Sequence, residues 1–152
     1  MIGREKELDR LGAFIAAGFS PTGLVLAGEP GIGKTTLWEA GIAAARERGI
    51  AVHATRAGEA EAQLSFAALI DLAGGLDLAG LPAPQRSALE IALLRREPEG
   101  APPQPHAIGL GLRNAFAARA PALIAIDDVQ WLDAPSAEAL AFAARRLHDQ
   151  SV

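Results

Sequence analysis

The sequence of 152 residues has no cysteine, contains only two lysines, and carries no cluster of basic residues. Without cysteine, the chain has no disulfide bonds, no thiolate metal site and no cysteine nucleophile. Only 21% of the residues are charged, and the formal net charge is -4 at pH 7. Because acidic and basic residues are interleaved along the chain, we expect no direct contact of this segment with nucleic acid.

Long hydrophobic runs are also missing. The start of the chain, MIGREKELDR, is charged from Arg4 onward, and no later run approaches the length of a membrane span. We therefore expect a cytoplasmic protein that has no membrane association. Half of the residues are apolar, and the length suits one domain with a substantial core, so we expect a single domain over residues 1–152.

The first third of the chain predicts an amphipathic helix followed by a βαβ unit. Residues 4–18 place Leu8, Leu11 and Ile15 on one helical face. The apolar run Leu24–Ala27 predicts a buried strand, and a helix follows from Lys34 to Arg48 with Gly49 as its stop. Residues 50–55 predict the next strand.

The remaining elements are predicted from periodicity and from turn residues. We expect helices over 66–72, 85–96 and 108–119, and an exposed proline-rich loop over 97–106. Leu123–Ile126 is an apolar run that ends at two aspartates, as a buried parallel strand would. Asp133 could cap a last helix, whose core side would carry Leu140, Ala144 and Leu147. The pattern as a whole favours an α/β fold with a parallel sheet.

The segment Gly28–Thr35 reads GEPGIGKT and fits the phosphate-loop pattern G-x-x-x-x-G-K-[ST]. Its glycines allow the backbone to bend around an anion, so that successive N–H groups point at phosphate oxygens at the start of a helix. Lys34 would bridge the β- and γ-phosphates, and the Thr35 hydroxyl is a hard oxygen ligand for Mg²⁺. We expect a nucleoside triphosphate to be held by Gly28, Glu29, Pro30, Gly31, Ile32, Gly33, Lys34, Thr35 and Thr36.

The two aspartates after the second apolar run supply acid groups for such a site. Asp127 is the expected partner of Mg²⁺, and Asp128 could orient or deprotonate an attacking water, which makes Lys34 and Asp128 the candidate catalytic residues. Taken alone, the aspartates could simply solvate the end of a strand. Their combination with a phosphate loop favours the functional interpretation of Asp127.

Three segments together, IGREKELDRL, GEPGIGKTTL and LIAIDDVQWLD, resemble the AAA-type ATPase domain of the STAND class, found at the N-terminus of large LuxR-type transcriptional regulators. The resemblance implies a P-loop NTPase-like fold that binds ATP with Mg²⁺ as a regulatory switch. It also implies self-association or partner regulatory domains. By this resemblance, the segment Ile2, Gly3 and Arg4 would lie against the adenine end of the bound nucleotide. Because many members have Glu where Asp128 stands, we expect slow hydrolysis.

The chain departs from the pattern of this family in one respect. In such ATPases a further strand follows the acidic one, lies between it and the phosphate-loop strand, and ends in a sensor residue before a lid subdomain. This sequence ends at RRLHDQSV, before any such strand. We therefore expect a doubly wound parallel sheet with flanking helices that is incomplete at its C-terminal side. Alternatively, the acidic strand pairs directly with the phosphate-loop strand in a smaller sheet.

Other functions fit the residues less well. A GTPase needs an N-K-x-D motif, and neither lysine, Lys6 or Lys34, follows an asparagine. A small-molecule kinase would share the phosphate loop, but the sequence indicates no acceptor pocket. A fragment that binds ATP or a partner chain without turnover remains an alternative. The histidines, His53, His106 and His148, have no ligand spacing and are interpreted as structural or solvated.

Overall fold

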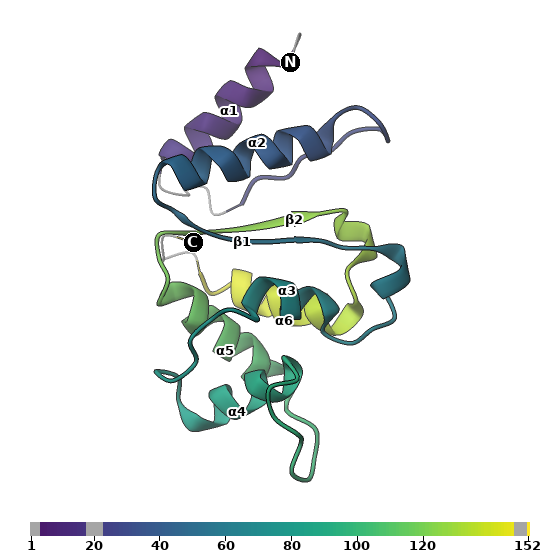
Figure 1. The fold of residues 1–152 in the computed structure, drawn as a ribbon, viewed down its shortest axis with the longest axis vertical. Helices are drawn as coiled ribbons and strands as arrows, with labels where there is room; N and C mark the ends of the chain where they lie inside the picture. Colours follow the sequence, from purple (N-terminus) through teal and green to yellow (C-terminus); the bar gives the residue numbers. More distant parts are fainter. Residues whose placement is uncertain (1–3, 18–22, 148–151) are drawn as a thin grey trace.

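The computed structural model of the chain describes residues 4–17, 23–147 and 152. The described residues form a mixed α/β structure with six α-helices, a parallel two-stranded sheet and two short 3₁₀ helices (Figure 1). In chain order the elements are α1 (Glu5–Ala16), α2 (Lys34–Glu47), β1 (Ala51–Arg56), η1 (Glu59–Glu61), α3 (Ala67–Ala73), α4 (Ala83–Ala92), α5 (Pro105–Ala117), β2 (Ala122–Asp127), η2 (Val129–Trp131) and α6 (Ala134–Ala144).

The two strands determine how the site is arranged. They pair in parallel, with Ala51 opposite Ala122 at one end and Arg56 opposite Asp127 at the other. Helix α2 covers one face of this sheet, while α3 and α6 lie on the opposite face (Figure 1). A parallel sheet with helices on both faces is therefore present, although the described residues do not form the larger doubly wound sheet that the sequence predicts.

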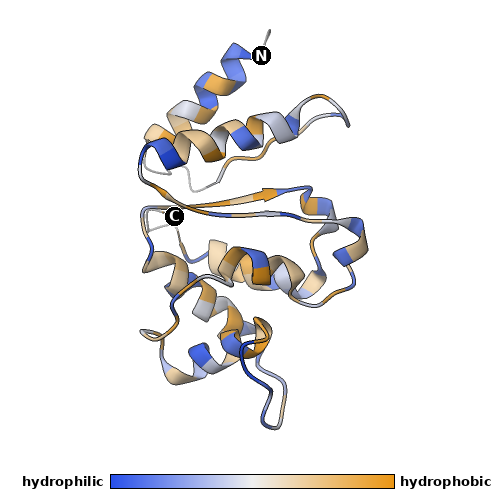
Figure 2. Cartoon of the chain, in the orientation of Figure 1, coloured by the Kyte–Doolittle hydropathy of each residue, from blue (hydrophilic) through white to orange (hydrophobic). Residues whose placement is uncertain are grey.

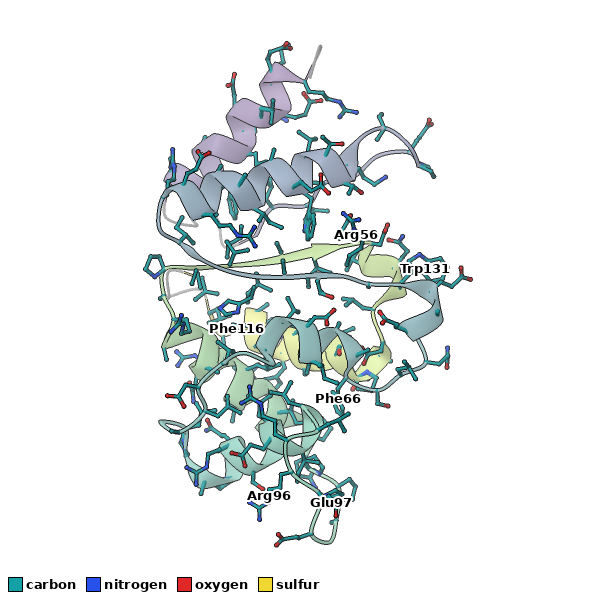
Figure 3. All side chains as sticks on the ribbon, viewed as in Figure 1. Arg56, Phe66, Arg96, Glu97, Phe116 and Trp131 are labelled. Carbon is teal, nitrogen blue, oxygen red and sulfur yellow. The ribbon has the colours of Figure 1, made fainter. Side chains whose placement is uncertain are left out.

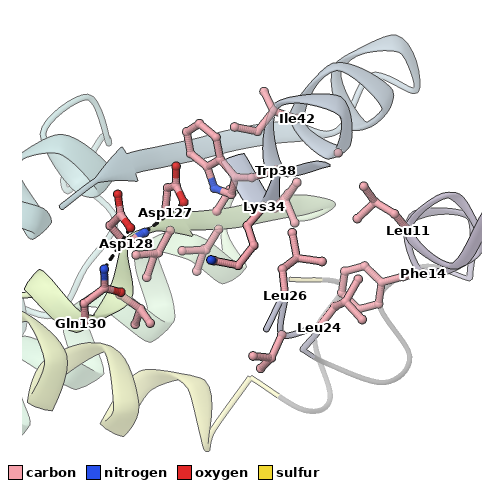
Figure 4. A pocket seen from close by; sticks show the side chains of 17 residues that line it. Leu11, Phe14, Leu24, Leu26, Lys34, Trp38, Ile42, Asp127, Asp128 and Gln130 are labelled. Atoms are coloured by element: carbon pink, nitrogen blue, oxygen red, sulfur yellow. Dashed lines mark hydrogen bonds between the residues drawn. The ribbon is translucent and has the colours of Figure 1, made fainter. Parts of the chain in front are cut away.

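The phosphate-loop segment differs from the prediction. Leu24–Ala27 forms no strand, and β2 pairs with β1 and with no other described segment. A cavity of about 330 Å³ lies between this segment and β2. It is lined by Leu24, Val25 and Leu26 on one side and by Leu123–Val129 on the other (Figure 4). A strand needs a neighbour roughly 4.8 Å away to share its hydrogen bonds. The predicted strand over Leu24–Ala27 and its alternative direct pairing with the acidic strand are therefore both wrong, because the cavity separates this segment from β2.

The largest core lies between the sheet and helices α3 to α6. Figure 2 shows that β2 is mostly hydrophobic, as expected for a strand that helices cover. The largest fully buried apolar side chains come from α3, α4 and α5 and are Leu69, Leu72, Leu89, Ile108, Leu112 and Phe116. On α6 the core side carries Ala139 and Ala143, so the predicted core position Ala144, which is exposed, is wrong.

Several local predictions are confirmed, with shifts at the element ends. Helix α2 begins at Lys34 and ends at Glu47, just before Gly49, whose φ of +72° suits glycine. Helix α4 stops at Ala92 rather than Arg96, because Leu94 has a φ of +55° that a helix does not accept. The amphipathic first helix is present as α1 with Ile15 buried, and Gly18, the last residue of the predicted range 4–18, lies outside the described residues.

His53 has a structural role on β1. Its Nδ1–H donates to the Leu72 carbonyl oxygen at 3.1 Å, and its ring lies 5.2 Å from the Phe116 ring. The other ring nitrogen, Nε2, is buried and has no partner among the described residues. Burial lowers the pKa of His53; the bond to Leu72 acts in the opposite direction, and the Arg119 charge lowers the pKa further. The imidazole is therefore neutral in the folded protein at pH 7.

We expect the stability of the fold to decrease with acidity because of His53. The pKa of this group is below 6.5 in the folded chain and near 6.5 in the unfolded chain, so the unfolded chain binds more protons in acid. The stabilisation that comes from neutral His53 is fully present above about pH 6.5, and the free energy of unfolding should fall as the pH is lowered below that value. The slope of the free energy of unfolding against pH, measured by urea unfolding followed by circular dichroism, should be smaller for His53→Gln than for the wild-type chain. The exposed His106→Gln variant should keep the wild-type slope, and equal slopes in both variants would contradict the assignment.

Candidate functional site

The loop from Gly28 to Thr36 leads directly into α2. Two of its glycines have positive φ angles, Gly31 at +78° and Gly33 at +91°, and Gly33 is the N-cap residue of α2. A side chain at either position would be strained, so the glycines of the motif are required by this turn. Glu29, Pro30, Gly31 and Ile32 are exposed, as is Thr36 in the first turn of α2. The loop is therefore open to solvent at the positive end of a helix dipole.

Lys34 folds back across this loop. Its Nζ donates to the carbonyl oxygens of Gly28 and Glu29, both at 2.9 Å. The ammonium group thus lies within the loop itself and also lines the cavity beside β2 (Figure 4). An ammonium group is a mobile donor that can exchange such carbonyl oxygens for the more strongly charged oxygens of a phosphate.

Thr35 and Asp127 meet although they are far apart in the sequence. The Thr35 hydroxyl donates to Asp127 Oδ2 at 2.9 Å, which joins the start of α2 to the end of β2. Asp127 is only 7% exposed, and its Oδ1 accepts the Asp128 backbone N–H at 3.1 Å. The sequence predicts this pair, and the structure brings the two side chains together.

These two oxygen groups fit a magnesium ion. Mg²⁺ prefers hard oxygen ligands and is commonly held by one or two protein groups together with phosphate oxygens and water. Among the described residues, no group of three or more His, Asp or Glu side chains could hold a metal ion without other ligands. The Thr35 hydroxyl and the Asp127 carboxylate therefore suit an ion that arrives with a nucleotide.

Arg56 is a site residue that the sequence analysis did not identify. Its Nε lies 3.2 Å from Asp127 Oδ2, and its terminal nitrogen lies 3.2 Å from Glu39 Oε1. The guanidinium carbon is 5.4 Å from the centre of the Trp38 ring. Figure 3 places Arg56 at the end of β1, near the end of β2. A sequence signal existed: Arg56 directly follows the predicted strand 50–55, and the carboxyl ends of parallel strands meet at one edge of the sheet.

Asp128 lies at the rim of the cavity. Its backbone is in the left-handed region, with φ +53° and ψ +47°, and its Oδ1 accepts the Gln130 amide at 3.0 Å (Figure 4). The side chain is half-buried, whereas Asp127 is buried. The two neighbouring carboxylates therefore lie in different surroundings: Asp127 is linked to Thr35, and Asp128 is linked to Gln130 in η2.

Arg4 ties the start of α1 to the phosphate loop. A terminal nitrogen of Arg4 donates to the Ile32 carbonyl oxygen, and the guanidinium also lies 3.6 Å from Glu7. The predicted neighbours Ile2 and Gly3 lie outside the described residues. The contact brings Arg4 to the loop through a backbone oxygen.

The whole sequence matches one protein-family model. The model described as AAA ATPase domain matches residues 1–152. The chain belongs to this AAA ATPase domain family. Membership supports a nucleotide-binding domain of the P-loop type, in agreement with the loop and the acidic strand end. No curated protein and no solved structure matches the chain. In the described part of this AAA ATPase domain, every helix is too short or too polar to cross a membrane.

Asp133 ends the segment that connects β2 to α6 and holds it in place. It is 2% exposed, caps α6 by accepting the Ser136 N–H at 2.9 Å, and also accepts the N–H groups of Phe66 at 2.8 Å and Ala68 at 3.2 Å. Burial alone would raise the pKa of Asp133, but hydrogen bonds from Ser136 and from the Phe66 and Ala68 N–H groups together lower it. The predicted cap is confirmed, and its link to the start of α3 is additional.

Removal of this carboxylate should be costly. Asp133→Ala should lower the free energy of unfolding by about 2–4 kcal/mol, because it removes a helix cap and leaves buried N–H groups without acceptors. Urea unfolding measures the loss. Asp77→Ala is the matched control, since exposed Asp77 accepts only the local Ala79 N–H at 2.9 Å, and it should cost much less. Equal losses in the two variants would contradict the role of Asp133.

Proposed function

We propose that this AAA ATPase domain binds ATP with Mg²⁺ through Gly28–Thr36 and Asp127 and hydrolyses it slowly. The observation that carries the proposal is the 2.9 Å hydrogen bond between Thr35 and Asp127, at the start of the helix where Lys34 crosses the loop. It joins the phosphate loop and the acidic strand end into one site. The match to the AAA ATPase domain family supports the same function.

In this proposal the protein groups have distinct tasks. The backbone N–H groups at the start of α2 bind phosphate oxygens, assisted by the helix dipole. Lys34 exchanges the Gly28 and Glu29 carbonyl oxygens for oxygens of the β- and γ-phosphates. Thr35 and Asp127 hold the magnesium ion and its water, and the ion, when bound, neutralises charge on the phosphate oxygens.

Asp128 is the proposed partner of the attacking water. Its half-buried carboxylate lies beside Asp127 at the cavity that Lys34 also lines. The side chain is short, and Oδ1 is held by Gln130, so proton transfer from a water requires the other carboxylate oxygen or a release of this bond. Both features support slow turnover. They also favour the competing function, in which the domain binds ATP and does not hydrolyse it.

The wider role proposed is that of a cytoplasmic regulatory switch of the STAND class, as in LuxR-type transcriptional regulators. The contact between Arg4 and Ile32 supports a place for the Ile2–Arg4 segment beside the bound nucleotide. The cavity between Leu24–Leu26 and β2 lies where this resemblance implies a further strand. A kinase function finds less support, since apolar side chains make up most of the lining of this cavity.

Lys34→Ala should weaken the binding of Mg·ATP at least about tenfold, because charge-assisted hydrogen bonds to phosphate are lost. Calorimetry with the purified chain measures the affinity, with GTP as the competing nucleotide. Lys6→Ala is the control, since Lys6 is the other lysine and is exposed on α1. Unchanged ATP affinity in Lys34→Ala would exclude the phosphate loop as the binding site.

Asp128→Asn should retain ATP affinity and reduce the rate of phosphate release by about 10²–10⁴-fold, because an amide does not accept a proton from water. Single-turnover phosphate release measures this rate, and calorimetry measures the retained affinity. Undiminished release would refute the role of Asp128. If the wild-type chain binds ATP and releases no phosphate, the domain functions by binding alone.

A further inference from the structure

Arg56 is a cationic partner of Asp127, the carboxylate that is proposed to hold magnesium. Asp127 Oδ2 accepts the Thr35 hydroxyl at 2.9 Å and forms an ion pair with Arg56, whose Nε lies 3.2 Å away. The Asp127 side chain is 9% exposed, whereas that of Arg56 is 51% exposed. The carboxylate is therefore fixed in the interior, and the guanidinium reaches it from the surface.

A guanidinium and a magnesium ion compete for the same carboxylate. Both are attracted by Asp127, and two cations next to the same carboxylate repel one another. The Thr35 hydroxyl can donate to Asp127 and offer a lone pair to the metal at the same time. Arg56, in contrast, has no lone pair to offer and must move away from Oδ2 when the metal is bound.

The surroundings of Arg56 provide a second position for it. Glu39, on α2, lies 3.2 Å from the terminal nitrogen of Arg56, and its side chain is 59% exposed. The ring of Trp38 lies next to the guanidinium, so the cation can turn over an aromatic face toward Glu39 while it stays partly desolvated. Arg56 is thus held between two carboxylates, of which only one belongs to the proposed magnesium site.

We propose that Arg56 is a positioning residue that holds Asp127 before magnesium binds and moves toward Glu39 when it does. This inference rests on the proposed function. Arg56 sets the free Mg²⁺ concentration at which ATP is bound tightly, because the metal must displace it. Glu39 favours the displaced position, so the two side chains have opposite effects on the magnesium requirement.

The test is the affinity for ATP over a series of buffered free Mg²⁺ concentrations. Arg56→Gln should lower the Mg²⁺ concentration for half-maximal effect by about fivefold, and Glu39→Gln should raise it about twofold, in keeping with ion pairs that are partly exposed. The Glu39→Gln effect should disappear in the Arg56→Gln background, since Glu39 acts through Arg56. Arg48→Gln, at an exposed site after α2, should leave the concentration unchanged.

Trp38 gives a second readout that does not depend on the folding of Arg56→Gln. The chain has two tryptophans, so Trp131→Phe leaves Trp38 as the sole emitter. Addition of Mg²⁺ at saturating ATP should change the Trp38 emission as the guanidinium turns, whereas ATP in EDTA should not.

The outcomes separate this inference from the proposed function. If the wild-type chain binds no ATP at any Mg²⁺ concentration, the proposed function fails. If it binds ATP through Lys34, but Arg56→Gln leaves the magnesium requirement unchanged or raises it, Arg56 is a structural ion pair and the inference is wrong. An emission of Trp38 that does not respond to Mg²⁺ leads to the same conclusion.

Discussion

The site depends on one oxygen atom, Oδ2 of Asp127. It accepts a hydrogen bond from Thr35 at the start of α2 and forms an ion pair with Arg56 at the end of β1, while Asp127 itself ends β2. Three elements therefore meet at a single carboxylate. This matters because residues 23–27, the described segment before the phosphate loop, pair with neither strand of the sheet. The loop is positioned by the packing of α2 and by these polar contacts rather than by strand pairing.

The two faces of the sheet serve different purposes. Below it, α3 to α6 enclose the large side chains of the core, among them Phe116 and Leu112. Above it, α2 contributes Leu37 and Ile42, and α1 contributes Ile15, which form a smaller apolar layer. The chemical groups lie at the carboxyl edge between these layers, where a rigid base supports loops that face solvent. The groups of the candidate site therefore lie on a part of the molecule that is packed less tightly than the core.

Features encoded by neighbouring residues could be predicted from the sequence. Helix α2, β2 and the Asp133 cap follow from local signals: the stop at Gly49, an apolar run ended by aspartates, and a capping residue before a helix. That Leu24–Ala27 forms no strand could not be predicted from these residues. Their sequence suits a strand, but a strand also needs a neighbouring strand to pair with. Arg56 was not predicted as a site residue because the predicted strand ended at Thr55. The register of the two parallel strands places Arg56 opposite Asp127.

The edge of β2 that faces the cavity has a consequence for handling the protein. A strand edge without a partner offers backbone N–H and C=O groups in a regular row, which is a template for pairing with another chain. Across the cavity from it, Val25 is 85% exposed and Leu24 is 42% exposed, which adds apolar surface next to this row. The association state should therefore depend on protein concentration, and any extended apolar peptide in the solution becomes a competitor for that edge.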